Sequence, residues 1–280
     1  MTYTKILDEF GFKSKNNVYI IAEIGLNHGG DLELAKKLID SAAKTGTDAV
    51  KFQTYLTEKR TAADSPIFNV LKKCELPFEA FKQLKEYSDK NNVEFFSTPF
   101  DEESAAYLNS IDVELYKISS FDVVNHNFLR KIASYGKPVI MSVGMSNTKE
   151  IETAFKILSK GTKKIALLHC ISAYPTQEED AMLSNIYELK KKFDCPIGQS
   201  DHTYDITVPL YAIAAGAQLI EKHYKIDDGM DCVDAPVSIT EKQLTRLVKE
   251  TRRLEKIIGK PKFGIRESEK EIEQFRRYSK

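Results

Sequence analysis

The sequence lacks tryptophan, and it has only four cysteines among its 280 residues. No two cysteines form a C-x-x-C pair, and their spacing shows no disulfide framework. Cys170 and Cys195 lie in or next to apolar runs with strand character, so we expect buried thiols. The other two are Cys74 and Cys232.

The chain also lacks an excess of charge, because 41 basic residues balance 41 acidic ones. This balance gives no indication of a nucleic-acid partner or a membrane surface, so any anion site must be built locally. No apolar run approaches ~20 residues, and no membrane span is expected. The N-terminus, MTYTKILDEFGF, has no basic segment followed by an apolar one. These features predict a cytoplasmic protein.

What the sequence does contain is a series of eight short apolar runs, separated by amphipathic helical patterns. Their brevity and their β-branched and aromatic content favour buried parallel strands over helices. In the first helical pattern, residues 31–46, Asp31 is placed to cap the start and Gly46 to end it. The runs cover residues 18–23, 49–53, 94–98, 115–119, 138–142, 165–170, 196–200 and 219–223.

Eight strand–helix units predict an α/β protein with a (β/α)8 TIM barrel. A doubly wound sheet is the competing architecture, but the count of eight and the lack of a G-x-G-x-x-G opening a helix disfavour it. We expect residues 1–17 to form an N-terminal hairpin that caps the barrel bottom, and residues 18–259 to form the barrel. The polar segment 260–280 is predicted to be a C-terminal tail or linker. Residues 54–78, the longest connection, are a candidate lid or binding loop.

Polar residues gather where the predicted strands end, which is where TIM barrels place their active sites. His202 and His223 follow two successive strands that would lie roughly 4.7–4.9 Å apart. Their imidazoles are therefore placed to bind one divalent ion such as Mn, Fe, Co or Zn. The alternative is that each histidine makes a hydrogen bond in the core. For His28 and His169, a structural role is at least as well supported.

Two lysines form a second set with hydroxyl residues at the same strand ends. Lys51 and Lys117 supply positive charge and the hydroxyls supply hydrogen bonds, which suits a ligand with a phosphate and a carboxylate. For Lys51 alone, the alternatives are a Schiff-base lysine or a buried ion pair with Glu23. The hydroxyl residues are Thr98, Ser120, Ser142 and Ser200.

The chain resembles the sialic acid synthase family, which comprises N-acetylneuraminate and other nonulosonic acid synthases. These enzymes condense phosphoenolpyruvate with an amino sugar. The matching motifs occur in the family's order and span residues ~18–259. They are 22-AEIGLNHGG-30, 49-AVKFQTY-55, 97-STPF-100, 116-YKISS-120, 138-PVIMSVGM-145, 168-LHCISAYPT-176, 200-SDHT-203 and 221-EKHY-224.

The resemblance implies a TIM barrel that cleaves the C–O bond of phosphoenolpyruvate with a divalent metal, which would be manganese or else magnesium, cobalt or iron. It implies that His202 and His223 are the metal ligands. Glu23, Lys51 and Lys117 are the implied catalytic residues, with Glu23 orienting the acceptor or handling a proton. The implied phosphoenolpyruvate site comprises Lys51, Thr98, Lys117, Ser120, Ser142, Ser172 and Ser200. The implied acceptor site comprises Glu23, Gln53, Tyr174 and Asp234.

The chain departs from the family pattern in two ways. Ala235 stands where the family commonly has His, so we expect an altered acceptor pocket. Ser172 stands where the family commonly has Asn, so its contact with phosphoenolpyruvate would differ from that of the family. Family members usually continue into a small antifreeze-like domain, which would begin near residue 275. We therefore expect a barrel-only form that acts as a homodimer or with a separate chain supplying that domain.

Two other functions stay open. One is a Schiff-base aldolase that uses Lys51 or Lys117. The other is a non-catalytic barrel that acts as a binding partner.

Overall fold

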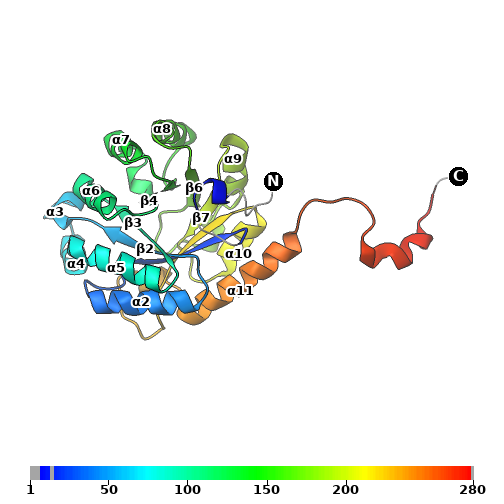
Figure 1. Ribbon diagram of the computed structural model, residues 1–280, viewed down its shortest axis with the longest axis horizontal. Coiled ribbons are helices and arrows are strands. Elements are labelled where there is room, and N and C mark those ends of the chain that lie inside the picture. Colours follow the sequence, from blue (N-terminus) through cyan, green and yellow to red (C-terminus); the bar gives the residue numbers. More distant parts are fainter. Residues whose placement is uncertain (1–6, 13–15, 279–280) are drawn as a thin grey trace.

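The computed structural model describes residues 7–12 and 16–278. Its centre is a sheet of eight parallel strands that pair in sequence order and close into a barrel, with β8 pairing to β1 (Figure 1). Each predicted apolar run overlaps one of these strands, so the predicted TIM barrel is confirmed. The strands are β1 (Tyr19–Gly25), β2 (Ala49–Thr54), β3 (Glu94–Pro99), β4 (Tyr116–Ile118), β5 (Val139–Ser142), β6 (Ile165–Cys170), β7 (Ile197–Asp201) and β8 (Leu219–His223).

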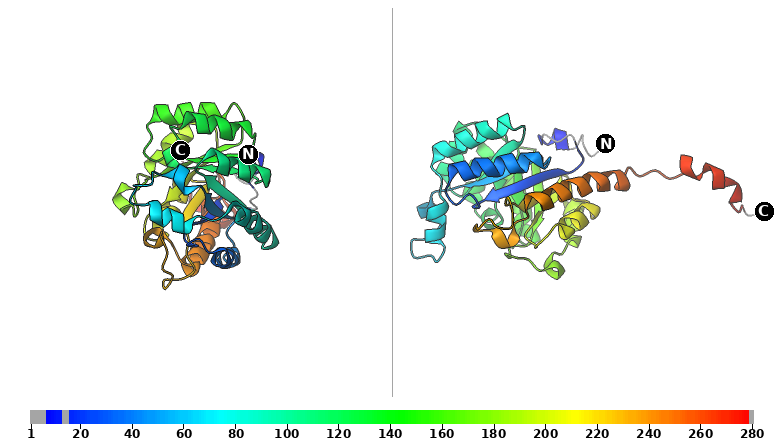
Figure 2. Two further views of the ribbon diagram at one scale, coloured as in Figure 1. Left: turned by 90° about the vertical axis from the view of Figure 1, so that its left-hand side faces the viewer. Right: turned by 90° about the horizontal axis from the view of Figure 1, so that it is seen from below.

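Helices lie between successive strands and surround the barrel (Figures 1 and 2). Asp31 caps α2 as predicted, because its side chain accepts hydrogen bonds from the backbone of Glu33 and Leu34. The helices outside the strands are α2 (Leu32–Lys44), α5 (Phe78–Lys90), α6 (Glu102–Ser110), α7 (His126–Ser134), α8 (Thr148–Leu158), α9 (Ser184–Lys192), α10 (Thr207–Ala214) and α11 (Glu241–Ile258). Two short helices, α3 (Thr57–Arg60) and α4 (Phe68–Cys74), occupy the long connection between β2 and α5. Three 3-10 turns lie in the loops at Ser120–Asp122, Glu178–Asp180 and Ala235–Val237.

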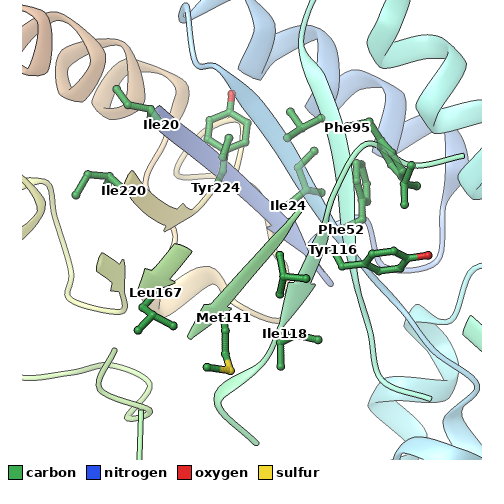
Figure 3. Close-up of a cluster of buried hydrophobic side chains, with 14 of the residues drawn as sticks. Ile20, Ile24, Phe52, Phe95, Tyr116, Ile118, Met141, Leu167, Ile220 and Tyr224 are labelled. Atoms are coloured by element: carbon green, nitrogen blue, oxygen red, sulfur yellow. The ribbon is translucent and has the colours of Figure 1, made fainter. Parts of the chain in front are cut away.

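The strands alternate between two separate hydrophobic clusters, because successive side chains point to opposite faces. The larger cluster joins the outer face of the sheet to the helices. Figure 3 shows part of it, including Ile20, Phe52 and Ile220. The smaller cluster fills the barrel interior with side chains such as Tyr19, Ile21 and Leu219. The inward parity of each strand is thereby fixed, and it determines which residues meet at the strand ends.

The N-terminal segment caps the interior cluster, but its described part is not a hairpin. Residues 7–9 are helical, and the backbone N–H groups of Phe10 and Phe12 both donate to the carbonyl of Leu7. Leu7 and Phe12 are fully buried against the interior cluster. Residues 7–12 therefore pack on the interior cluster as a helical turn and not as part of the hairpin expected for residues 1–17. The remainder of the expected hairpin falls at residues 1–6 and 13–15, outside the described residues.

Beyond α11 the chain runs away from the barrel (Figures 1 and 2). Residues 260–278 are all exposed and contain one 3-10 helix, Glu267–Phe275. Within the described part of the chain, no helix is both long and apolar enough to cross a membrane.

Candidate active site

The site is formed by the inward-pointing side chains nearest the C-terminal ends of the barrel strands. Along β1 the inward side chains are Tyr19 and Ile21 in the apolar interior and then Glu23. The strand register sets Glu23 opposite Lys51 of β2 and opposite His223 of β8. Three ionisable side chains from neighbouring strands are therefore brought together by backbone pairing alone.

One pocket at the C-terminal end of the strands, which we call the barrel mouth, gathers almost all the predicted site residues. Every one of them except Asp234 lines it. Asp234 lies beside the pocket, where its Oδ2 is 3.3 Å from Nδ1 of His223. The lining residues from the prediction are Glu23, Lys51, Gln53, Thr98, Lys117, Ser120, Ser142, Ser172, Tyr174, Ser200, His202 and His223.

A buried network of charges links the two lysines through carboxylates. Nζ of Lys51 lies 3.1 Å from Oε1 of Glu23 and 3.3 Å from Oε1 of Glu221. Nζ of Lys117 lies 3.8 Å from the same oxygen of Glu221, which also accepts a hydrogen bond from Ser200. The ion pair between Lys51 and Glu23 that the sequence offered as an alternative is present, but it is part of a larger group.

This network gives its members different proton affinities. Burial raises the pKa of Glu221, but Lys117 and Lys51 outweigh burial and lower that pKa to about 2. Burial also raises the pKa of Glu23, and there the neighbouring cations do not fully compensate. Burial lowers the pKa of Lys117 to about 8. For Lys51, Glu221 and Glu23 outweigh burial, so its pKa lies above the usual value.

Hydroxyl groups line the side of the pocket formed by β3 to β6. Lys117 donates to Oγ of Ser142 at 2.7 Å, and Lys51 donates to Oγ1 of Thr98 at 3.2 Å. The backbone N–H of Gly144 donates to Oγ of Ser120 at 2.9 Å. A Cβ at Gly144 would lie only 2.6 Å from Oγ of Ser172, so this close packing of hydroxyls requires glycine.

The two predicted histidines lie side by side at the mouth, with ring centroids 5.4 Å apart. Nδ1 of His202 donates to the carbonyl of Ile171 at 2.8 Å, and burial lowers the pKa of His202 to about 3. His202 is therefore a neutral imidazole with the lone pair on Nε2. Burial lowers the pKa of His223, but Asp234 outweighs burial and raises it. The described residues contain no group of three or more His, Cys, Asp or Glu side chains arranged to hold a metal ion.

A buried ion pair fixes the loop that carries His202. The carboxylate of Asp201 lies 2.7 Å from Nζ of Lys222, and both side chains are almost fully buried. Oδ2 of Asp201 also accepts hydrogen bonds from the backbone N–H and the hydroxyl of Thr203. Lys222 donates in addition to the carbonyl of Thr203. The residues on both sides of His202, Asp201 and Thr203, are therefore fixed by their contacts with each other and with the buried Lys222.

Other features lie outside this chemistry. Nε2 of His169 lies 2.7 Å from the carbonyl of Ala181, and Nδ1 of His28 accepts from the backbone of Gly30. Both histidines have the structural contacts that the sequence favoured for them. A separate pocket of about 410 Å³ opens between α8 and α9 and shares Cys170 with the site. Its charged lining residues, Glu188 and Lys192, are exposed and do not converge.

Sequence reasoning missed several residues that line the site. Arg60 ends the short helix α3, Phe100 follows β3, and Phe121 lies in the 3-10 turn Ser120–Asp122, so none of them belongs to a periodic apolar pattern. Glu221 stands in the motif 221-EKHY-224, but its contact with both lysines was not foreseen. Cys170 was interpreted only as a buried thiol, although its position at the end of β6 matches that of the other site residues. The cysteines are all free, with Cys74 and Cys170 buried and Cys195 and Cys232 partly buried.

Comparison with known proteins identifies relatives along nearly the whole chain. The NeuB family model matches residues 38–263. An N,N'-diacetyllegionaminic acid synthase of Campylobacter jejuni is 40% identical over 268 residues, covering 90% of this chain and 79% of that protein. A protein of the same name from Legionella pneumophila is 36% identical, covering 88% of this chain and 74% of that protein.

A solved structure is similar in both sequence and fold. The N-acetylneuraminic acid (sialic acid) synthetase of Leptospira borgpetersenii is 45% identical to this chain and superposes with a TM-score of 0.90. The match covers 92% of this chain and 90% of that one. The family model matches most of this chain, residues 38–263, and these relatives are 36–45% identical to it. The chain therefore belongs to the NeuB family.

Proposed function

We propose that the protein is an enzyme that condenses phosphoenolpyruvate with an amino-sugar aldose, forming a nonulosonic, sialic-acid-like acid and phosphate. The observation that carries this proposal is the convergence of two buried lysines, their hydroxyl partners and a histidine pair in one pocket. Membership of the NeuB family supports it, as do the names of relatives that make legionaminic and sialic acids.

The proposed reaction joins C3 of phosphoenolpyruvate to the aldehyde carbon of the open-chain sugar. Water adds at C2, and the bond from C2 to the phosphate oxygen breaks, so that phosphate leaves. Lys51 and Lys117 offset the negative charge of the phosphate and carboxylate, while Thr98 and Ser142 orient these groups. Glu23, whose raised pKa favours the protonated form, holds a proton for the aldehyde oxygen as it becomes a hydroxyl.

The residues at the mouth fit a divalent metal. His202 is neutral, and its Nδ1 donates a hydrogen bond to the backbone carbonyl of Ile171. The lone pair on its Nε2 is therefore available to bind an ion. Nδ1 of His223 lies 3.3 Å from Oδ2 of Asp234, and a carboxylate beside one ring nitrogen is typical of a histidine that binds a metal through the other. His202 and His223 would hold the ion, manganese or else magnesium, cobalt or iron. When bound, it would polarise the aldehyde oxygen as a Lewis acid.

The experiment that tests the function is an assay of phosphate release from phosphoenolpyruvate. The protein is mixed with manganese and a panel of aldoses that includes N-acetylmannosamine and diacetamido sugars. We expect release with at least one sugar, its loss with a chelator, and a decrease of more than about 100-fold in His202→Ala, since loss of an outer partner alone costs about 10–100-fold. His126→Ala, outside the pocket, is the control. Full, chelator-resistant activity in His202→Ala would refute the metal site.

One observation favours a second candidate, a Schiff-base aldolase. The pKa of Lys117, lowered to about 8 by burial, is what a nucleophilic lysine requires. Borohydride reduction in the presence of a keto acid would trap an adduct on Lys117. Absence of an adduct in the wild-type protein would exclude this candidate.

The surface of the mouth supports a proposal about partners. Phe121 and Tyr174 line it and are each more than half exposed, and aromatic side chains are enriched at interaction surfaces. We propose that a homodimer partner or a separate chain covers the mouth and that residues 260–280 serve as a linker. Light scattering on the purified protein, alone and with candidate partners, tests this.

We also propose that the reaction takes place in the cytoplasm. Four free cysteines support this location, because reducing compartments keep thiols unpaired. Fractionation of the source cells is the test.

A further inference from the structure

Arg60 occupies the end of α3, in the 54–78 connection that the sequence marked as a candidate lid or binding loop. It follows β2, which carries Lys51 and Gln53, and its side chain lines the active-site pocket. None of the roles proposed above uses it.

The segment that carries Arg60 is anchored and does not behave as a free lid. The backbone N–H of Leu56 donates to the carboxylate of Asp101 at 3.0 Å, and that of Thr57 donates to Glu75 at 2.8 Å. The Tyr55 hydroxyl donates to the carbonyl of Leu71 at 2.8 Å. These contacts fix the position of α3, so the backbone that carries the Arg60 side chain is held in place.

The guanidinium of Arg60 is packed but only partly hydrogen-bonded. Its Cζ lies 3.8 Å from the ring centroid of Phe100 and 4.6 Å from that of Tyr55. Nη1 donates to Oε1 of Gln53 at 2.9 Å. Among the residues that the structure describes, no carboxylate lies within ion-pair distance of it. A guanidinium has five N–H donors in a fixed plane, so donors remain for a ligand in the pocket.

A line of polar contacts shows which end of the pocket Arg60 serves. Arg60 contacts Gln53, Gln53 donates to Glu23 at 3.2 Å, and Glu23 pairs with Lys51. Lys117 and Ser142 lie beyond Lys51 at the other end of this line. Along this line, Gln53 and Glu23, two residues proposed to face the sugar, lie between Arg60 and Lys51.

We propose that Arg60 is a specificity-determining residue. Its guanidinium donates hydrogen bonds to an oxygen atom of the acceptor sugar that carries no proton of its own. An acetamido carbonyl and a phosphate oxygen share this chemistry, and the planar fork of Arg60 suits both. This inference rests on the proposed condensation reaction. Stacking on Phe100 holds the guanidinium plane, so the donors are oriented before the sugar binds.

The test compares Arg60→Ala and Arg60→Lys with Lys59→Ala, a control on the same helix whose side chain is half exposed and outside the pocket. Kinetic constants are measured with N-acetylmannosamine, with its 6-phosphate, and with mannose, which lacks the acetamido group. Loss of a hydrogen bond to a charged donor predicts about a 10- to 100-fold rise in the KM of the preferred sugar in Arg60→Ala. The dissociation constant of phosphoenolpyruvate should change less than about 2-fold, and Arg60→Lys should recover part of the loss.

The sugars separate the two oxygen sources. If Arg60 binds the acetamido carbonyl, the preference of the wild type for N-acetylmannosamine over mannose disappears in Arg60→Ala. If it binds a phosphate, the preference for the 6-phosphate disappears instead. An unchanged preference for both groups overturns the proposal, as does an equal loss of phosphoenolpyruvate affinity or a loss of folding stability that accounts for the kinetic change.

A second measurement keeps this test separate from the proposed reaction. Calorimetry with sugar titrated into phosphoenolpyruvate-loaded protein, with a chelator present, detects acceptor binding without turnover. A wild type that never releases phosphate refutes the reaction. Weaker sugar binding in Arg60→Ala than in Lys59→Ala still supports the role of Arg60, and equal binding in the two variants overturns it.

Discussion

The affinity for phosphoenolpyruvate should depend on pH through Lys117. This lysine is 2% exposed, and burial lowers its pKa to about 8, whereas the pKa of Lys51 is raised because Glu221 and Glu23 outweigh burial. Of the two lysines, only Lys117 therefore loses its proton near pH 8. A bound anion stabilises the ammonium form and raises its pKa. Binding is then strongest below about pH 8 and weakens as the pH rises above it.

The size of the effect follows from the pKa of about 8 for Lys117. At pH 7 almost all of the free protein carries the ammonium, and at pH 9 only about a tenth does. The dissociation constant should therefore rise about 10-fold between pH 7 and pH 9, which corresponds to about 1.4 kcal/mol. Ionisation of a phosphate group, with a second pKa of about 6, is nearly complete across this range and contributes little.

Calorimetry of phosphoenolpyruvate binding without sugar measures this directly. Titrations at pH 9 in two buffers with different ionisation enthalpies should show uptake of close to one proton per bound molecule. Lys117→Ala should bind more weakly, with an affinity that no longer changes over this range. A flat affinity in the wild type, or the same slope in Lys117→Ala, would refute the assignment.

Three further outcomes follow from the same geometry. Glu221→Gln should move the midpoint of the pH profile below 8, because the Glu221 carboxylate raises the pKa of Lys117; an unmoved midpoint would contradict the network. Asp201→Asn should lower the free energy of unfolding by about 3–5 kcal/mol by leaving Lys222 buried and unpaired. Urea unfolding should also show that the double variant Asp201→Leu/Lys222→Met loses less free energy of unfolding than Asp201→Asn, because it leaves no unpaired buried charge. Gly144→Ala should weaken phosphoenolpyruvate binding at least about 10-fold, because its Cβ would meet Oγ of Ser172 at 2.6 Å. Gly229→Ala, in an exposed loop, serves as the control for that titration.

The barrel and most of its site were predictable because buried parallel strands leave a clear pattern. In 219-LIEKH-223, Leu219 lies in the interior cluster and Ile220 in the outer one. Glu221 and His223 continue the inward parity of Leu219. An apolar run of this kind indicates a strand. Polar residues at its last inward positions indicate which end of the strand contributes to the active site. The sequence predicted that Glu23, Lys51 and Lys117 would meet at the strand ends, and all three line the barrel mouth.

The remaining features depend on contacts between segments that are distant in sequence. Nothing in the sequence around Arg60 shows that Phe100, which follows β3, will pack against its guanidinium. The N-terminal cap is a similar case. Leu7 and Phe12 are five positions apart, which would put them on opposite faces of a strand. The turn formed by the backbone hydrogen bonds to Leu7 brings both into the interior cluster.

The register of the barrel also explains how the site holds two lysines without an excess of positive charge. Strands β2 and β8 both pair with β1, and Nζ of Lys51 on β2 lies within ion-pair distance of Glu23 on β1 and Glu221 on β8. Glu221 remains ionised between the lysines, while burial raises the pKa of Glu23. An anion that approaches Lys51 competes with Glu23 for the ammonium and raises the pKa of Glu23 further. Binding of phosphoenolpyruvate therefore favours protonation of Glu23, the group proposed to supply a proton to the sugar.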